Sequence, residues 1–390
     1  MTREIELIEL ARDLGPKLAS VNVDSEKTCK PEKRAIEQLR TNGLLAMTIP
    51  SAYGGIEADA LTCLKVIEEL SYWDSGIGWS TMIYSKTALL GACVPEEHAS
   101  QMFGVRDSNG VLECPIAAGA AAPTGQAQVV DGGIVVSGRW SWGSGAAHAD
   151  WIAGGTIVEK EGETVSRNGQ PALHLVFFEK EDVRLLDNWD PSGLRGTGSG
   201  DFEVVDVFVP DGRWMIIGDV APFDSPLFKF PAFSYFALSV AAVPLGIARR
   251  AVDDFDSLMS GRIPSSTSKT IATAPITQRE FGEAESLVLG AHHYVWGQVE
   301  CAWEKVTAGI ELTAEDRREL RMAAVQATLM CTQAVDLLYH AAGGGAVQGD
   351  SPMQRHFRDI HVATQHRQVS REFLRVSGGM RLDNEVAPTI

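Results

Sequence analysis

Apolar positions recur with a helical period over the first 110 residues. "ALTCLKVIEELSYWD" at 60–74 places apolar residues three or four apart, and "GWSTMIYSKTALLGACV" at 78–94 is apolar on nearly every side. The first pattern is typical of an amphipathic helix, and the second is typical of a helix buried all round. Residues 1–110 are therefore predicted to form an N-terminal helical domain.

The pattern changes to that of strands between residues 111 and 215. In "AQVVDGGIVVSGRWSWGSG" at 127–145 and "FEVVDVFVP" at 202–210, β-branched residues alternate with polar ones. Such short alternating runs indicate strands with one buried face. Asp131-Gly132-Gly133 predicts a hairpin turn, because Asp and Gly tolerate the positive φ angles that tight turns need. A central β domain, a barrel or a sandwich, is expected at 111–215.

Long helical patterns return after residue 216. Four segments of similar length carry them: 234–259, 276–306, 313–344 and 353–378. "TAED" at 313–316 has the spacing of a capping box, so it predicts the start of the third of these helices. Four long amphipathic helices favour a bundle. The expected fold class is α+β, with an N-terminal helical domain, a central β domain and a C-terminal four-helix bundle at 216–390.

Composition and charge narrow the class of partner. The chain is 45% hydrophobic and 22% charged, with a formal net charge of -17 and no excess of Lys and Arg to neutralise phosphates. We therefore expect neither a nucleic-acid nor a membrane partner. Six cysteines occur without a C-x-x-C pair, and the acidic first residues do not resemble a signal peptide. These features predict a reducing, cytoplasmic location.

The usual short catalytic motifs are missing from the sequence. It contains no P-loop, no G-x-S-x-G and no H-E-x-x-H, and the glycines of "RGTGSGD" at 195–201 precede a strand rather than a helix. His361 and His366 are five apart, so on one helix they would diverge by about 140°. No metal site is predicted. On the residues alone, packing is favoured over catalysis for any single histidine by about two to one.

Four stretches, taken in order along the chain, resemble a known family. They are "IPSAYGG" at 49–55, "GRWSWGSGAAHADW" at 138–151, "WDPSGLRGTGSGDFEVVDVFVP" at 189–210 and "AAGGGAVQGDSPMQRHFRDIHVATQH" at 341–366. Together with the order of the domains, they resemble the acyl-CoA dehydrogenase superfamily. More narrowly, they resemble its branch of two-component, flavin-dependent monooxygenases, of the 4-hydroxyphenylacetate and hydroxylated-steroid hydroxylase types.

The resemblance implies a function and its partners. It implies an enzyme that takes reduced flavin, FADH2 or FMNH2, from a separate flavin reductase and activates O2 as a flavin C4a-hydroperoxide. The product would be an oxygenated small molecule, most simply an aromatic one. The resemblance also implies a homotetramer, or dimer of dimers, with flavin at a subunit interface. The choice between FAD and FMN stays open.

The same resemblance assigns roles to particular residues. Trp142 would cover one face of the flavin ring and Gly145 would let the backbone approach it. Ser144 would donate to, or accept from, flavin N5, and His366 would act as the catalytic acid or base, on the helix that carries "RDIHVATQH". Further cofactor contacts are implied at four positions: Gly344, Gly345, Thr364 and Gln365. Arg358 and Asp359 are expected to form a structural pair.

The substrate and the reaction keep alternatives. Thr87, Asp350 and His361 are candidate substrate residues. Many phenol hydroxylases of this branch have a histidine at the position of Thr87, so indoles, polyketide rings, amino sugars and aromatic thioesters stay open beside phenols. The first alternative function is an acyl-CoA dehydrogenase with Asp350 as the base, although Asp is one methylene shorter than the Glu of that branch. The second alternative is a non-catalytic interaction protein with a flavin fold.

Overall fold

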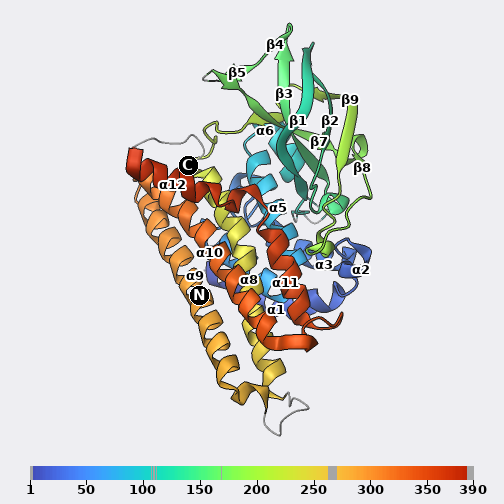
Figure 1. The fold of residues 1–390 in the computed structure, drawn as a ribbon. Coiled ribbons are helices and arrows are strands. Elements are labelled where there is room, and N and C mark those ends of the chain that lie inside the picture. The colour runs from blue at the N-terminus through green and yellow to red at the C-terminus, as the bar shows by residue number, and fades with distance from the viewer. Residues whose placement is uncertain are drawn as a thin grey trace.

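The N-terminal part of the chain is helical in a computed structural model that describes residues 3–383, apart from 107, 109, 111, 168 and 262–269 (Figure 1). Its elements are α1 (Arg3–Val21), α2 (Ser25–Thr28), α3 (Lys33–Thr41), η1 (Leu44–Ala46), η2 (Ser51–Tyr53), α4 (Ala60–Trp73), α5 (Ser75–Gly91) and α6 (Glu96–Phe103). Asp74 starts α5 by accepting a hydrogen bond from the amide of Ile77. Within α5 only Leu90 is not buried, which confirms the helix predicted to be covered on every side.

The central part is one eight-stranded mixed sheet with a small two-stranded sheet beside it. The large sheet runs in the order β10-β7-β3-β1-β2-β9-β8, with β4 paired to β3. The strands are β1 (Ala117–Val130), β2 (Gly133–Trp140), β3 (Trp151–Lys160), β4 (Glu163–Thr164), β5 (Ser166–Arg167), β6 (Gln170–Pro171), β7 (Leu173–Glu179), β8 (Arg184–Leu185), β9 (Phe202–Pro210) and β10 (Trp214–Ile216). Val130 pairs with Gly133 across the turn at Asp131 and Gly132, as predicted for the hairpin.

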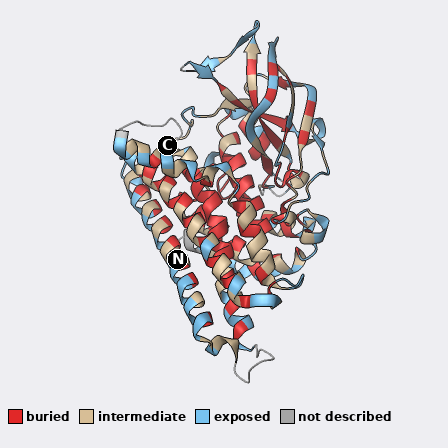
Figure 2. Cartoon of the chain, viewed as in Figure 1, coloured by how far each residue is buried: buried red, intermediate tan, exposed pale blue. Residues whose placement is uncertain are grey.

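The C-terminal part is dominated by three long helices that pack side by side (Figure 1). They are α8 (Ala232–Ser260), α9 (Pro275–Thr307) and α10 (Ala314–Ala342), and the shorter elements are α7 (Pro226–Lys229), η6 (Ile271–Thr273), η7 (Gly343–Gly345), α11 (Pro352–Ala363), η8 (Arg367–Val369) and α12 (Glu372–Asp383). Thr313 and Asp316 form the predicted capping box of α10. By length and hydropathy α8 could cross a membrane, but 78% of its most apolar window is buried inside the protein, as in a core helix (Figure 2).

The fourth helix of the predicted bundle is interrupted. The segment 353–378 was expected to be continuous, yet α11 ends at Ala363 and α12 begins at Glu372. His366 lies in this break with an extended backbone (φ -69°, ψ 130°), and its ring accepts a hydrogen bond from the amide of Gln368. The prediction that His366 lies on the α11 helix is therefore wrong, because its side chain caps the next turn instead.

Helices from the two ends of the chain pack against each other and close the core. α4 and α5 contact α8, and α11 contacts both α8 and α10. Figure 2 shows the buried positions concentrated where these helices meet, below the sheet. Ser144, in the loop that follows β2, is hydrogen-bonded to Trp79 of α5 and to Ser199, in the loop that precedes β9. Both loops therefore reach the region where the helices meet.

Candidate active site

The hydroxyl of Ser144 lies at the centre of a buried hydrogen-bond chain. Its Oγ is 3.1 Å from Nε1 of Trp79 on α5 and 2.6 Å from Oγ of Ser199, in the loop before β9. Ser199 Oγ is in turn 2.6 Å from Oγ1 of Thr197, and Thr197 Oγ1 donates to the carbonyl oxygen of Leu194 at 2.7 Å. The chain joins α5 to two loops of the β domain.

The carbonyl at the end of this chain fixes the direction of its hydrogens. A hydroxyl has one hydrogen to donate and two lone pairs to accept with. Thr197 donates its hydrogen to the Leu194 carbonyl oxygen. Ser199 must therefore donate to Thr197, and Ser144 must donate to Ser199. Ser144 also accepts from the indole N–H of Trp79. One lone pair of Ser144 is left, so towards a bound molecule this hydroxyl is an acceptor.

Two residues of the loop around Ser144, Trp142 and Gly145, have left-handed backbones. Trp142 has a φ of 64° and its side chain is exposed, at 69%. Gly145 has a φ of 72°, and a Cβ there would come within 2.4 Å of the Tyr84 ring. Tyr84 donates to the Gly145 carbonyl at 3.2 Å. Glycine at 145 is therefore required by the packing of the loop against α5, in addition to any approach by a cofactor.

His366 is held between two aromatic rings. Its ring centroid is 5.7 Å from that of Trp79 on α5 and 5.3 Å from that of Phe236 on α8, both edge-on. Nδ1 of His366 accepts from the amide of Gln368 at 3.2 Å. In a neutral imidazole whose Nδ1 is an acceptor, the proton is on Nε2. His366 therefore presents an Nε2–H donor.

Burial and a neighbouring charge keep His366 neutral. Removal from water and, to a smaller extent, the positive charge of Arg321 together lower the pKa of His366 to about 4. Arg321, on α10, is itself buried and donates to the Phe233 carbonyl and to Oε1 of Gln368. The imidazole of His366 is thus uncharged near neutral pH. The expected role of acid or base narrows to that of a neutral ring that donates through Nε2–H.

Trp79 connects the two residues assigned to catalysis. It donates to Ser144 through its ring nitrogen and packs against His366 with its ring, so Ser144 and His366 contact the same side chain. Sequence reasoning missed Trp79, because a tryptophan in an all-apolar helix is read as core. Its position in "GWS" at the start of α5 carries no motif. Only the structure brings the three together.

The loop that holds Thr197 and Ser199 is fixed by α11. Asp359, a buried residue of α11, accepts from the Leu194 amide at 2.7 Å and from the Ser75 hydroxyl at 2.5 Å. Its ion-pair partner is Arg355, at 3.5 Å. The expected pair between Arg358 and Asp359 is wrong, because Arg358 contacts Glu26 at 3.0 Å and the Ser192 carbonyl at 2.6 Å.

Four other predicted residues lie on α5 and at the C-terminal end of α11. Thr87 is buried, and its hydroxyl donates to the Ile83 carbonyl of its own helix at 2.9 Å. His361 pairs with Asp336 of α10 at 2.8 Å, across the α10–α11 contact. Thr364 donates to the carbonyl of His361 at 2.6 Å. Within the described part of the chain, the hydrogen bonds of His361 and Thr364 do not involve Ser144 or His366, and Gln365 is exposed.

Gly344, Gly345 and Asp350 lie at the opposite end of α11 from His366. The glycines form η7 and Asp350 is exposed just before α11. Since α11 has 12 residues, about 18 Å of helix axis separates this group from the break that contains His366. Within one chain, the predicted cofactor residues therefore form two groups that do not meet.

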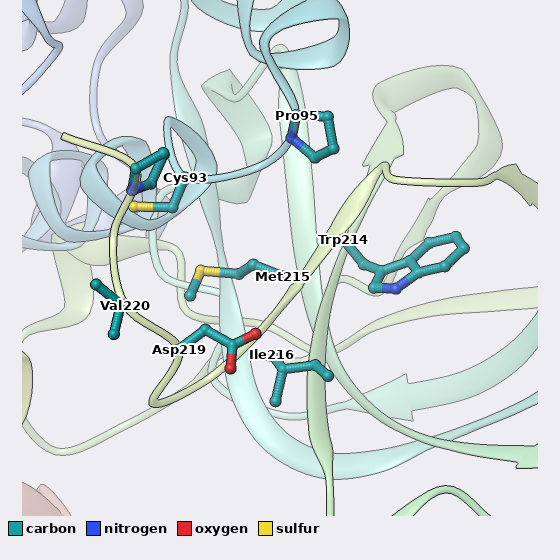
Figure 3. A pocket seen from close by; sticks show the side chains of 8 residues that line it. Cys93, Pro95, Trp214, Met215, Ile216, Asp219 and Val220 are labelled. Carbon is teal, nitrogen blue, oxygen red and sulfur yellow. The ribbon is translucent and has the colours of Figure 1, made fainter.

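A pocket lies away from the Ser144–Trp79–His366 group. It has a volume of about 290 Å³ and is lined by Cys93, Pro95, Trp214, Met215, Ile216, Asp219, Val220 and Pro222. Figure 3 shows these side chains on β10, on the segment after it and on the segment after α5. Cys93 follows the end of α5 and Trp79 is near its start, about 20 Å apart along the helix axis.

Comparison with known proteins agrees with this geometry. The family model for the N-terminal domain of acyl-CoA dehydrogenase matches residues 9–94, and the model for the C-terminal domain matches residues 238–371. Together they cover more than half of the chain. The predicted acyl-CoA dehydrogenase-like fold is thereby confirmed for both helical parts.

Relatives and solved structures align over nearly the whole chain. An indole-3-acetate monooxygenase from Acinetobacter baumannii is 28% identical over 93% of this chain and 90% of its own length. The oxygenase subunit of a flavin-dependent monooxygenase from Rhodococcus jostii is 27% identical over 85% of this chain and 86% of its own. The structure of XiaF from Streptomyces sp. in complex with FADH2 and glycerol shares the fold, with a TM-score of 0.90, 22% identity and coverage of 99% and 98%. This protein is a member of the acyl-CoA dehydrogenase family.

Proposed function

We propose that this protein is the oxygenase component of a two-component flavin-dependent monooxygenase. It would use reduced flavin and O2 to add oxygen to a small, aromatic substrate. The observation that carries the proposal is that the buried Ser144 and the half-buried His366 both contact the side chain of Trp79. Relatives named as monooxygenases, one of them as flavin-dependent, align over most of this chain and support it.

The free lone pair of Ser144 fits a reduced flavin. The N5 atom of a reduced flavin carries a hydrogen, whereas that of an oxidised flavin does not. Ser144 has already donated its own hydrogen to Ser199, so its oxygen suits a donor such as N5–H. The exposed indole of Trp142, two residues before, is free to cover a planar ring. A bound reduced flavin would supply the electrons and the site at which O2 reacts.

His366 supplies a fixed hydrogen-bond donor to the same region. Because Nδ1 is occupied by the Gln368 amide, the Nε2–H group is the one available to a substrate or to a bound oxygen species. The low pKa of about 4 keeps the ring neutral, so it can donate a hydrogen bond without placing a charge there. The rings of Trp79 and Phe236 cover His366 and limit the access of water.

The dehydrogenase alternative has less support from the geometry. Within one chain, about 18 Å of helix separates its base, the exposed Asp350, from the break that contains His366, and Asp is one methylene shorter than the Glu of that branch whichever subunit supplies it. A proton-abstracting base must come within hydrogen-bond reach of the substrate carbon it acts on. No contact in the described part of the chain favours the non-catalytic alternative.

We further propose a separate flavin reductase, a homotetramer and a cytoplasmic location. The reductase is supported by the absence of a nicotinamide-binding motif from the sequence and by relatives named as oxygenase subunits. The tetramer is supported by the separation of the two groups of predicted cofactor residues. One flavin could contact both groups only if the second came from a neighbouring subunit.

The origin of the inserted oxygen tests this function. The protein is supplied with NADH, an unrelated flavin reductase, FMN or FAD, and a panel of aromatic probes that includes indole-3-acetate, under ¹⁸O₂. We expect mass spectrometry to find one ¹⁸O atom in at least one probe, in the presence of this protein only. Absence of ¹⁸O from every probe, together with reduction of a dye by acyl-CoA thioesters, would replace the proposal by the dehydrogenase alternative.

A further inference from the structure

Four slightly exposed residues lie on one face of α5, and Thr87 and Leu89 beside it, at 8%, are covered to the same extent. Trp79, Ile83 and Lys86 keep 6–8% of their surface exposed, whereas Tyr84 keeps 1%. Leu90, one turn further, is half-buried. At 100° per residue the first three and Leu90 fall within an arc of about 60° on the helix. This face runs from Trp79, near the start of α5, to Leu90, near its end, and the pocket at Cys93 lies just beyond that end.

Lys86 and His366 are linked through contacts with α5 and α8. Lys86 follows Trp79 by two helical turns on the same face of α5, about 10 Å along the axis. On α8, Tyr235 contacts Lys86 and the next residue, Phe236, contacts His366. The two residues are thus joined through α5 on one side and α8 on the other.

The amine of Lys86 has no hydrogen-bond partner in the part of the chain that the structure describes. Its Nζ is buried, and it lies 2.6 Å from the centroid of the Tyr235 ring. Buried lysines normally pair with a carboxylate, because an unpaired buried charge is costly. An amine kept in this position without an anion has its hydrogen-bonding capacity free for a ligand.

The groups packed around Lys86 leave this capacity unused. Cys63 faces it from α4 and Tyr235 from α8. The negative charge of Asp59, the cap of α4, helps to raise the pKa of both Cys63 and Tyr235. Burial raises the pKa of Cys63 to about 12 and that of Tyr235 well above its ordinary value, so neither is an anion near neutral pH. Burial lowers the pKa of Lys86 well below its usual range, which favours the neutral amine.

We propose that Lys86 is a specificity-determining residue that recognises a carboxylate on the aromatic substrate. The proposal rests on the proposed function, since it places the aromatic ring at the Trp79–His366 end and the acid about two helical turns away. The carboxylate enters ionised, and the amine takes one proton from solvent to become an ammonium group. A charge-assisted hydrogen bond then joins Nζ to a carboxylate oxygen, and no covalent bond of the substrate changes.

Matched probes with and without the charge test this role. Indole-3-acetate is compared with indole-3-acetamide, and 4-hydroxyphenylacetate with its amide, by calorimetric titration of the whole protein. Titrations are made on the protein alone and with reduced FMN under argon, in two buffers of different ionisation enthalpy. We expect at least one acid to bind about tenfold more tightly than its amide and to take up about one proton. The amide should take up none.

Variants separate the amine from the fold. Lys86→Met, of similar length, should lose about tenfold in affinity for the acid and lose the proton uptake, while amide affinity changes by less than about threefold. Lys65→Met on α4 removes a positive charge elsewhere and should leave both affinities unchanged. If Lys86→Met does not fold, the proton uptake of the unmodified protein on binding the acid still tests the role of the amine.

Three results would overturn the role of Lys86. They are an acid-to-amide ratio that Lys86→Met leaves unchanged, acid binding without proton uptake, and failure of both acids to bind. If any of these occurred while ¹⁸O still entered another probe, only the carboxylate site would be rejected. If no ¹⁸O entered any probe, the proposed function would be rejected as well.

Discussion

At the scale of single residues, the positions of two hydrogens define what the site can bind. Ser144 has its hydrogen directed at Ser199, and His366 has its hydrogen on Nε2. One is an acceptor and the other a donor towards whatever binds beside Trp79. The resemblance to a family suggested both residues, but it left their donor and acceptor roles open. Those roles follow from the Leu194 carbonyl and the Gln368 amide, which no sequence pattern reveals.

Removing the Ser144 hydroxyl should affect the flavin rather than the fold. Ser144→Ala loses one hydrogen bond to a buried partner, a change worth about 1–3 kcal/mol. We expect reduced flavin bound to the variant to be oxidised by O2 about tenfold faster, with more H2O2 released per product. Ser137→Ala, a surface serine on β2 bonded to Asp206, is the control. Equal oxidation rates in Ser144→Ala and the unmodified protein would argue against contact with N5.

Replacing His366 should mainly reduce product formation. His366→Ala removes the Nε2–H donor, and we expect a loss of about 10²-fold in product formed per flavin, with a smaller change in reduced-flavin binding. His361→Ala, which breaks a half-exposed pair with Asp336, should be milder. Product formation is measured by chromatography with a separate reductase. The assignment fails if His361→Ala is inactive and His366→Ala is close to the unmodified protein.

The low pKa of His366 also predicts a pH dependence of stability. Its pKa is about 4 in the folded protein and near 6.5 in the unfolded chain, so between these values the unfolded state binds more protons. Stability should therefore fall as the pH falls from 6.5 towards 4, with a contribution from His366 of at most about 3 kcal/mol. Above pH 6.5 this contribution is constant.

His366→Gln removes this titration. We expect urea unfolding to show a smaller loss of stability between about pH 7 and about pH 5 in His366→Gln than in the unmodified protein. An identical loss in both proteins would mean that the imidazole titrates normally in the folded state.

At the scale of elements, α11 acts through Asp359, whereas His366 lies beyond its end. Its Asp359 holds the loop of Thr197 and Ser199, so it positions the hydroxyl chain of Ser144 from a distance. Asp359→Ala would leave Arg355 without one of its carboxylates and the Leu194 amide without its acceptor. Breaking a buried network of this kind costs about 3–5 kcal/mol.

We therefore expect Asp359→Ala to unfold at lower urea concentration and to release more H2O2 per flavin oxidised. Asp350→Asn is the matched control, because Asp350 is exposed, and its stability should change by less than about 0.5 kcal/mol. The same variant would be inactive if Asp350 were the base of a dehydrogenase. Unchanged peroxide release in a folded Asp359→Ala protein would show that the loop does not need α11.

Sequence periodicity predicted α5, the β1–β2 hairpin and the start of α10, because local contacts fix each of these elements. It missed the break between α11 and α12. "VATQHRQVSRE" contains no glycine or proline, so its pattern continues a helix. The break exists because the His366 ring takes the Gln368 amide and packs between α5 and α8, which are distant in the sequence. Tertiary contacts outweigh local preference there.

At the scale of the whole molecule, the order of helical, strand and helical parts was predictable because each pattern extends over many residues. The separation between Ser144 and the Gly344–Gly345 turn could not be predicted from the sequence, since it depends on how α11 packs. We expect a homotetramer, in which a neighbouring subunit brings that turn to the flavin. Light scattering at micromolar concentration measures this directly. A monodisperse monomer that still binds reduced flavin would contradict it.

The most direct test of the central claim is the fate of reduced flavin bound to this protein when O2 is added. Protein and reduced FMN or FAD are mixed under argon, then rapidly mixed with O2, and the absorbance of oxidised flavin is followed. The account predicts that oxidised flavin forms much later than in protein-free buffer and that Ser144→Ala shortens this delay. Oxidised flavin that forms at the protein-free rate, in both the unmodified protein and the variant, would contradict it.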